Sequence, residues 1–510
     1  MKKGILILLA LCMLATLFTA CGSTSDPGGK TDAETKGSEQ GGQETDGGQE
    51  TDAAPQAKFE VPEELDYGTE FTILTCPGEN PTTDFYWTQF GEYSINGDIL
   101  NDAIFDRNKA LEEFLGITLV LNTSGHLTNT NAYENAVTAG SEDAPDLGVW
   151  IDRFALNVAL KGMVLPVSEM QKYYVDLEKP WWYQSVNDTL SIDHQLFFAA
   201  GYFNLDLFGS MQMLLVNRDI IEDKQLMDPY DLVDTRTWTM DVMYGLMLDA
   251  VQDVDGDDTM TEEDIWGAVK NGSMWNNNYV SVSGQKFVAK DSNDIPYLNM
   301  DGNDYLLDIM SMLVEDLTAP ELTMEINKAK IYTQGHVYEN IVSMFADGHA
   351  LFAGTSATYM GNIRNSEVDY GIVPFPPYEA ISQNEEYKSY NIVVIGHIVP
   401  STCKDPALTS AVLESMAYYS YTGVVPSFVE SVLQLRNVRD EKSGDIMRML
   451  NRNMDIELGQ AYWYDQIMAG TVSKIFAGGI NTYASTLAEN KSKIEAAIEA
   501  SIKVFSALND

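Results

Sequence analysis

The sequence contains few cysteines, few histidines and few basic residues. Its 510 residues include 4 Cys and 5 His, and 31 Lys and Arg stand against 76 Asp and Glu, which gives a net charge of −45. So acidic a chain repels phosphate backbones, and nucleic acid is therefore disfavoured as a partner. The cysteines are too few for a disulfide scaffold, and their spacing leaves the pairing of Cys76 with Cys403 open.

Local catalytic motifs are also missing. The sequence has no G-x-S-x-G, H-E-x-x-H, P-loop, G-x-G-x-x-G or C-x-x-C motif, and its histidines are scattered without metal-ligand spacing. We therefore assign no catalytic residue and expect a protein that is not an enzyme. One enzyme class stays open, because the carboxylate pair of a glycosidase has no local motif.

The longest apolar run lies at the N-terminus. Two lysines precede the apolar residues 4–17, and Phe-Thr-Ala-Cys21 follows. The run is shorter than the roughly 18 to 20 residues that cross a bilayer, so residues 1–20 are predicted to be a cleaved secretory signal. Its end resembles a bacterial lipobox, which implies that Cys21 is lipidated and anchors the protein to the outer face of the membrane. The alternative is an ordinary secretory signal with an incidental cysteine.

A polar segment follows the predicted anchor. Residues 22–58 consist mainly of Gly, Ser, Thr, Asp, Glu and Gln, and the hexapeptide GGQETD at 41–46 is repeated at 47–52. Such a composition cannot form a core, so residues 21–58 are interpreted as the lipidated cysteine and a flexible tether with a reach of roughly 35 Å. The rest of the chain exceeds the roughly 250 to 300 residues at which a single core stops growing, so two lobes are expected.

The beginning of the body alternates predicted strands and helices. The strands are expected at 71–75, 117–121 and 146–150, and the helices at 100–115 and 131–138. This order is typical of βαβ units with a mainly parallel sheet. Gly116 is expected to end the first helix, and Thr239 to cap a helix over 240–251. A C-terminal helix is expected to bury an apolar stripe made of Leu487, Ile494, Ile498, Ile502 and Phe505.

Several short motifs occur in an order that resembles family-1 extracellular solute-binding proteins. They are DRN at 106–108 with FLGI at 114–117, ALKGM at 159–163 with LPVS at 165–168, TWT at 237–239, MFADG at 344–348, and DYGIVPFP at 369–376. The resemblance implies an α/β, two-lobed, periplasmic-binding-protein-like fold, with a crossover hinge and a ligand cleft between the lobes. We expect the first lobe over 59–175, the second over 176–340, a return to the first over 341–400, and mainly second-lobe helices over 401–510.

The segment 253–264 carries oxygen ligands at the spacing of a calcium loop. The candidate ligands are Asp253, Asp255, Asp257, Thr259, Thr261 and Asp264. Asp258 stands at the sixth position, where such loops have Gly, and the last ligand is Asp in place of Glu. A structural Ca²⁺ site and a plain acidic surface turn both remain open.

Aromatic and polar residues that follow strand-like runs are the candidates for a sugar site. A sugar offers a C–H face to an aromatic ring and hydroxyls to polar groups, and open α/β sheets bind ligands at the ends of their strands. The candidates are Trp87, Trp150, Asp152, Arg153, Tyr202, Trp275, Asn276 and Tyr359. Trp275 is interpreted as an exposed platform flanked by amides, and Asp152 with Arg153 as a pair that holds hydroxyls or, alternatively, a surface ion pair.

Three functions follow as hypotheses. The first is a membrane-tethered binding protein that captures a sugar or oligosaccharide and delivers it to the permease subunits of an ABC importer. The second is a secreted carbohydrate-active enzyme that uses two carboxylates. The third is a surface adhesin without a small ligand.

Overall fold

The computed structural model describes residues 58–62, 65–75, 94–123, 129–140, 144–363, 366–391, 393–429 and 440–509. The predicted signal, Cys21, the tether, Cys76 and Trp87 lie outside this part of the chain. Residues 57–510 form one compact unit. None of the described helices combines the length and the apolar character that a bilayer span requires.

The first sheet has the strand order β12-β3-β1-β2. Its first three strands in the chain, β1 (Thr69–Leu74), β2 (Ile117–Asn122) and β3 (Leu147–Ile151), are parallel, as expected from the alternation of strands and helices. The last strand, β12 (Ile395–Ile398), comes from far along the chain and runs antiparallel beside β3. The predicted βαβ units are therefore confirmed.

Local sequence determines where the helix between β1 and β2 begins and ends. Helix α2 (Ile99–Leu115) begins after Asp98, whose carboxylate accepts the backbone N–H groups of Leu100 and Asn101. It ends at Gly116, which adopts φ 61° in the left-handed region, as predicted. A Cβ atom at this position would lie 2.2 Å from Asp66 Oδ1, so glycine is required by the backbone and by space.

The second sheet has the order β10-β4-β9-β5-β8. Strand β5 pairs in parallel with β8 and β9, whereas β4 runs antiparallel to β9 and β10. The strands are β4 (Gln212–Asn217), β5 (Trp266–Lys270), β8 (Thr323–Glu325), β9 (Ala350–Ser356) and β10 (Tyr370–Val373). All residues of β4, β5, β9 and β10 are buried, so this sheet is covered on both faces.

The strand pairing corrects two of the expected lobe boundaries. The return to the first lobe was expected at residue 341, but β9 and β10 still belong to the second sheet, and the chain rejoins the first sheet only at β12. The segment 401–510 is also divided, because α14 (Pro406–Tyr419) packs on α2 and α17 (Leu458–Tyr462) packs on α4 (Asp152–Ala159). Sequence periodicity carries no information about which sheet a strand joins.

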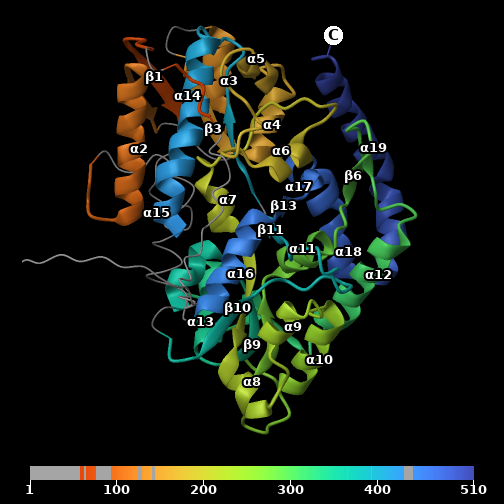
Figure 1. Ribbon diagram of the computed structural model, residues 1–510. Coiled ribbons are helices and arrows are strands. Elements are labelled where there is room, and N and C mark those ends of the chain that lie inside the picture. Colours follow the sequence, from red (N-terminus) through yellow and green to blue (C-terminus); the bar gives the residue numbers. More distant parts are fainter. Residues whose placement is uncertain are drawn as a thin grey trace, which may run out of the picture. The chain divides into compact units, whose positions relative to one another are not determined.

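A small parallel ladder lies where the chain crosses between the two sheets. Strand β11 (Ser389–Asn391) pairs with β13 (Met454–Ile456), and β11 also contacts β4 and helix α11 (Gly272–Val282). Figure 1 shows both short strands between the elements of the first sheet and those of the second. Helix α7 (Leu205–Ser210), which leads into β4, is an earlier crossing.

Helices cover both sheets. Helix α10 (Met240–Ala250) is capped by Thr239 as predicted, and α19 (Tyr483–Ser506) buries its expected apolar stripe, including Ile494 and Phe505. The remaining α-helices are α3 (Asn131–Ala139), α5 (Val167–Gln171), α6 (Gln184–Leu190), α8 (Arg218–Lys224), α9 (Pro229–Asp234), α12 (Asp304–Met312), α13 (Val337–Ala346), α15 (Val425–Val429), α16 (Glu441–Arg452) and α18 (Ser473–Gly478). Shorter elements are the strands β6 (Val288–Lys290) and β7 (Pro296–Leu298). The π-helices are η2 (Leu313–Leu317), η5 (Ser420–Val424) and η7 (Asp465–Val472), and the 3₁₀-helices are η3 (Ile326–Lys328), η4 (Ala357–Ile363) and η8 (Ile480–Thr482).

Candidate functional site

Strand β11 and helix α11 carry buried polar atoms that have no hydrogen-bond partner among the described residues. They belong to α11 and to β11 itself, two elements that contact one another. The atoms are Trp275 Nε1, Asn276 Oδ1, Asn277 Oδ1, the Tyr390 hydroxyl and Asn391 Oδ1. Each buried group left without a partner costs about 1 to 3 kcal/mol, and native proteins contain few of them. Water or a bound polar molecule can satisfy such a group.

The group contains both donors and acceptors. The Trp275 indole N–H and the Tyr390 hydroxyl can donate, and the amide oxygens of Asn276 and Asn277 can accept. The Asn391 amide nitrogen is already engaged, since it donates to the carbonyl oxygen of Leu207 at 2.6 Å, which leaves the amide oxygen as acceptor. A ligand that is donor and acceptor at once, such as one with hydroxyl groups, matches this set.

Charged side chains act on Tyr390. Burial raises the pKa of Tyr390 well above its usual range, and the charges of Glu457, Asp152 and Asp455 raise it further, as does nearby Tyr338. Tyr390 therefore stays protonated and remains a donor. Lys286 offsets part of this negative charge, because its ammonium group pairs with Asp455.

Asp152, a candidate from the sequence, is buried at the start of α4. Burial raises its pKa to about 7, against the backbone N–H groups of Arg153 (2.7 Å) and Val394 (3.2 Å), which donate to its carboxylate. Asp206 binds the residue after Val394 in the same way, because its carboxylate accepts the Ile395 backbone N–H at 2.8 Å. These two carboxylates therefore position the entry into β12.

Two aromatic groups adjoin helix α7. Tyr359, another candidate, lies in η4, which contacts α7, and its ring stacks on His336 at 5.3 Å and on Tyr338 at 5.1 Å between centroids. Tyr202 precedes α7 and stacks on Tyr183 at 4.3 Å. The rings of His336, Tyr338, Tyr359 and Tyr202 are half-buried, so part of their surface remains available.

Two candidate tryptophans are buried, against the exposure that a stacking platform requires. Trp150, at the end of the strand expected over 146–150, is fully buried within β3 and packs edge-on against Tyr133. Trp275 was expected to be an exposed platform, but it lies in α11, is 4% exposed and packs against Phe375 and Gly354. Local sequence shows that an aromatic ring follows a strand, but burial depends on which distant segments cover it.

Arg153 also differs from its expected role. Its guanidinium lies over the rings of Phe154 and Tyr464, at 5.0 and 4.9 Å from their centroids, and it forms no ion pair with Asp152. It lines a pocket of about 360 Å³ between α4, residues 462–466 and α19. Arg153 therefore belongs to a different region from the one around β11.

A second pocket, of about 730 Å³, adjoins α11. Asn276 contributes to its wall together with the ion pair of Lys270 and Glu325, whose charged atoms are 2.9 Å apart. Both carboxylate oxygens of Glu325 also accept the Gly272 N–H at the start of α11. Asn276 thus lies between this pocket and the region around β11.

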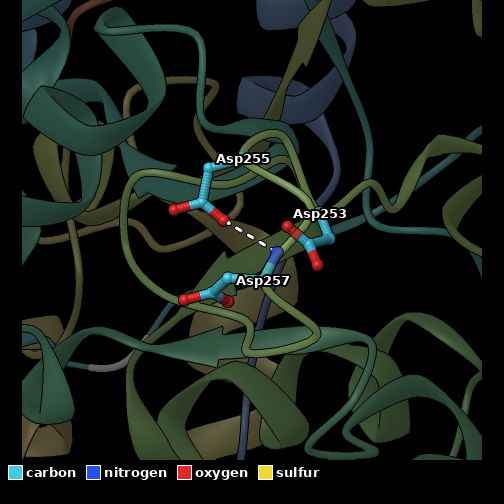
Figure 2. A group of neighbouring side chains, drawn as sticks. All are labelled: Asp253, Asp255 and Asp257. Atoms are coloured by element: carbon cyan, nitrogen blue, oxygen red, sulfur yellow. Dashed lines mark hydrogen bonds between the residues drawn. The ribbon is translucent and has the colours of Figure 1, made fainter.

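The acidic loop brings three of its six expected ligands together. Oxygen atoms of Asp253, Asp255 and Asp257 lie within 4.8 Å of one another (Figure 2). The backbone N–H of Asp257 lowers the pKa of Asp255, but the charges of Asp257 and Asp253 act in the opposite direction and the pKa is raised overall. Asp258 adopts φ 63°, the left-handed conformation that the usual glycine provides at this position. The loop therefore makes the required turn despite the substitution.

Asp264, the expected last ligand, is used within the loop. Its two carboxylate oxygens accept the backbone N–H groups of Val254 (2.8 Å) and Thr261 (2.6 Å). Burial acts to raise its pKa, but these hydrogen bonds outweigh burial and the pKa is lowered.

Sequence reasoning missed several residues of the candidate site. Tyr390, Asn391 and Tyr338 come from segments far apart in the chain and carry no local pattern. The run of three asparagines at 276–278 was the one available signal, since consecutive amides inside a buried helix require partners.

Comparisons with known proteins show the fold. No family model and no curated protein matches the chain. Among solved structures, a sugar transporter from Rhizobium etli in an open conformation is 12% identical with a TM-score of 0.55, and covers 86% of this chain and 99% of its own. UgpB from Mycobacterium tuberculosis, in complex with glycerophosphocholine, is 13% identical with a TM-score of 0.50, and covers 84% and 98%. The chain therefore has the two-lobed α/β fold of extracellular solute-binding proteins.

Proposed function

We propose that the protein is a membrane-tethered solute-binding protein of an ABC importer that captures a sugar or oligosaccharide. The observation that carries this proposal is the set of five buried, unpartnered polar atoms around β11. Sugar hydroxyls both donate and accept hydrogen bonds, which this mixture of donors and acceptors requires.

Three further observations support the proposal. The half-buried rings of Tyr359 and Tyr202 adjoin the crossing helix α7, and partly exposed aromatic rings suit contact with a sugar. The same fold occurs in the sugar transporter from Rhizobium etli and in UgpB, which is in complex with the small polar solute glycerophosphocholine. Solute-binding folds close around a ligand between their lobes, and β11 lies on a segment that crosses between them.

The enzyme hypothesis finds less support. Asp152 and Asp206 are neighbouring buried carboxylates, but each accepts a backbone N–H at the entry into β12. A glycosidase requires two carboxyl groups that flank a bound substrate. Hydrolysis of glycans by the purified protein would favour the enzyme, and the absence of any stabilising small molecule would favour the adhesin.

A ligand screen tests the binding proposal. We expect a sugar or oligosaccharide to raise the melting temperature of the chain from residue 57 onward, because a ligand that binds only the native state stabilises it. Tyr390→Phe removes one hydroxyl and should weaken binding of that sugar by about three- to tenfold. Tyr297→Phe, at an exposed tyrosine, is the matched control. The proposal is wrong if no carbohydrate shifts the melting temperature of the parent protein.

Export and anchoring form the second part of the proposal. The N-terminal pattern supports lipidation at Cys21, which places the body outside the cytoplasm beside its permease partners. Cys21→Ser should move the protein from the membrane fraction to the soluble fraction. Equal partitioning of variant and parent would contradict lipidation.

A structural Ca²⁺ ion is the third part. Three clustered carboxylates repel one another, and a cation relieves that repulsion. The left-handed turn at Asp258 supports a calcium-type loop, whereas the use of both Asp264 oxygens by the loop backbone reduces the number of free ligands. We expect a weak site that stabilises the loop and takes no part in sugar binding.

A further inference from the structure

Arg153 is a half-buried cation without an anionic partner in a strongly acidic protein. The chain carries 76 acidic residues, yet among the described residues no carboxylate forms an ion pair with this guanidinium and no acceptor takes its N–H groups. Arginine carries five N–H donors in a fixed planar arrangement. The donors of Arg153 are therefore available to a molecule that enters from outside.

The position of the guanidinium is fixed by aromatic rings. Its carbon lies 5.0 Å from the Phe154 ring centroid and 4.9 Å from the Tyr464 ring centroid. A cation held over two ring faces loses little further freedom when it binds an anion, because its orientation is already set. The N–H groups at the edge of the guanidinium are then the polar atoms with which Arg153 can bind a ligand.

The other walls of this pocket are both polar and apolar. Asn157 and Gln466 contribute amides, Leu160 and Val504 contribute aliphatic surface, and Ala500 contributes a small side chain. Two donors beneath are satisfied within the protein, since Trp463 Nε1 donates to Ser501 Oγ at 3.2 Å and the Tyr462 hydroxyl donates to the carbonyl oxygen of Leu190 at 2.8 Å. The pocket of about 360 Å³ thus combines one cationic group with neutral polar groups and an apolar wall, and its size matches a single-ring molecule.

We propose that this pocket, which is separate from the site around β11, binds a small organic acid whose carboxylate or phosphate pairs with Arg153 and whose ring rests on the apolar wall. A planar oxyanion can accept two parallel N–H bonds from a guanidinium. Two charges oppose it: Asp465 lines the same pocket, and Asp152 precedes Arg153 in the chain. Affinity is therefore modest, and it depends on Arg153.

The experiment is isothermal titration calorimetry of the full chain with four probes. Phenylacetate and phenyl phosphate carry a ring and an anion, benzyl alcohol has the ring without the charge, and acetate has the charge without the ring. We expect each ring-bearing anion to bind at least tenfold more tightly than benzyl alcohol and acetate. The tighter of the two anions identifies the natural group as carboxylate or phosphate. Equal binding of phenylacetate, phenyl phosphate and benzyl alcohol would overturn the proposal.

Three variants sharpen this result. Arg153→Gln should remove the preference for the anions, and Asp465→Asn should strengthen their binding by several-fold, because it removes an opposing charge. A purely structural role for Arg153 predicts no gain in Asp465→Asn. Arg448→Gln, at an exposed arginine paired with Asp445, is the matched control and should bind like the parent.

A last variant tests the proposal in case Arg153→Gln fails to fold. If circular dichroism shows that Arg153→Gln does not fold, Ala500→Leu decides, because it narrows the pocket and leaves the guanidinium in place. We expect loss of anion binding in this variant at an unchanged melting temperature. Unchanged affinity in Ala500→Leu would place the anion elsewhere and contradict the proposal.

Discussion

Two buried polar regions of this protein differ in whether their hydrogen bonds are complete. Glu414, in α14, is 2% exposed, and its carboxylate accepts the indole N–H groups of Trp181 (2.8 Å) and Trp182 (3.0 Å) and the backbone N–H of Asp176 (3.2 Å). Around β11, the Tyr390 hydroxyl is equally buried but has no partner among the described residues. A complete network holds the fold together, whereas an incomplete one reserves its groups for a molecule from outside.

The comparison predicts opposite consequences of mutation. Removing a member of the Glu414 network leaves a buried donor without an acceptor, which costs stability. Removing a polar atom near β11 leaves nothing newly unpaired, so it costs affinity. The predictions below run from the largest expected loss of stability to the smallest.

Trp275→Ala should cause the largest loss, about 3 to 5 kcal/mol in the free energy of unfolding, because the ring is 4% exposed and fills the space beside Phe375 and Gly354. Urea denaturation measures it, and Trp275→Phe should lose less. A loss below about 1 kcal/mol together with lost sugar binding would restore the exposed-platform interpretation.

Glu414→Gln should cost about 1 to 3 kcal/mol, because a neutral amide has one acceptor oxygen for donors that a carboxylate serves with two. The exposed Glu321→Gln is the control, with no change in unfolding free energy. If both variants unfold alike in urea, the network around Glu414 does not stabilise the fold.

The carboxyl group of Glu414 also predicts that the stability of the protein depends on pH. Burial raises the pKa of Glu414 to about 7, from an ordinary 4.5, against the hydrogen bonds of Trp181, Asp176 and Trp182. The folded state then holds the proton more tightly, so this contribution to stability is present below about pH 4.5 and is lost as the pH rises to about 7. Melting curves between pH 4.5 and 7 should fall less steeply for Glu414→Gln than for the parent, and identical slopes would contradict the raised pKa.

Asp255→Ala tests the exposed acidic loop, which resembles neither buried region. Chelation should lower the melting temperature of the parent by a few degrees and leave that of Asp255→Ala unchanged, since one Ca²⁺ ligand is gone. Sugar affinity should stay the same in both. A parent protein that is insensitive to chelation would leave only the acidic surface turn.

Tyr390→Phe should cause no loss of unfolding free energy and should raise it by up to about 1 to 3 kcal/mol, because the deleted hydroxyl has no partner to lose and its burial without a partner costs stability. Urea denaturation of the unliganded variant checks this expectation. A loss as large as that of Glu414→Gln would show that the hydroxyl takes part in a stabilising network, and the contrast between the two regions would disappear.

Much of the fold was predictable where the information is local. The βαβ unit of β1, α2 and β2 followed from apolar periodicity, and its helix ended at Gly116 as expected, because a left-handed residue is favourable only for glycine. The cap at Thr239 and the apolar stripe of α19 depend on neighbours within one or two turns, and both were correct. The spacing of Asp253, Asp255 and Asp257 likewise brought three carboxylates together within one loop.

The candidate site was decided by tertiary structure. Strand β11, which carries Tyr390, contacts α11 and pairs with β13, which lies more than sixty residues further along the chain. Trp275 is covered by Phe375, which comes from another distant segment. Backbone periodicity specifies which face of an element is apolar, but it does not specify which element covers that face. Sequence alone therefore determined the fold class and the local turns of this protein. Packing between distant segments determined which polar groups were left without partners, and so where a ligand is expected to bind.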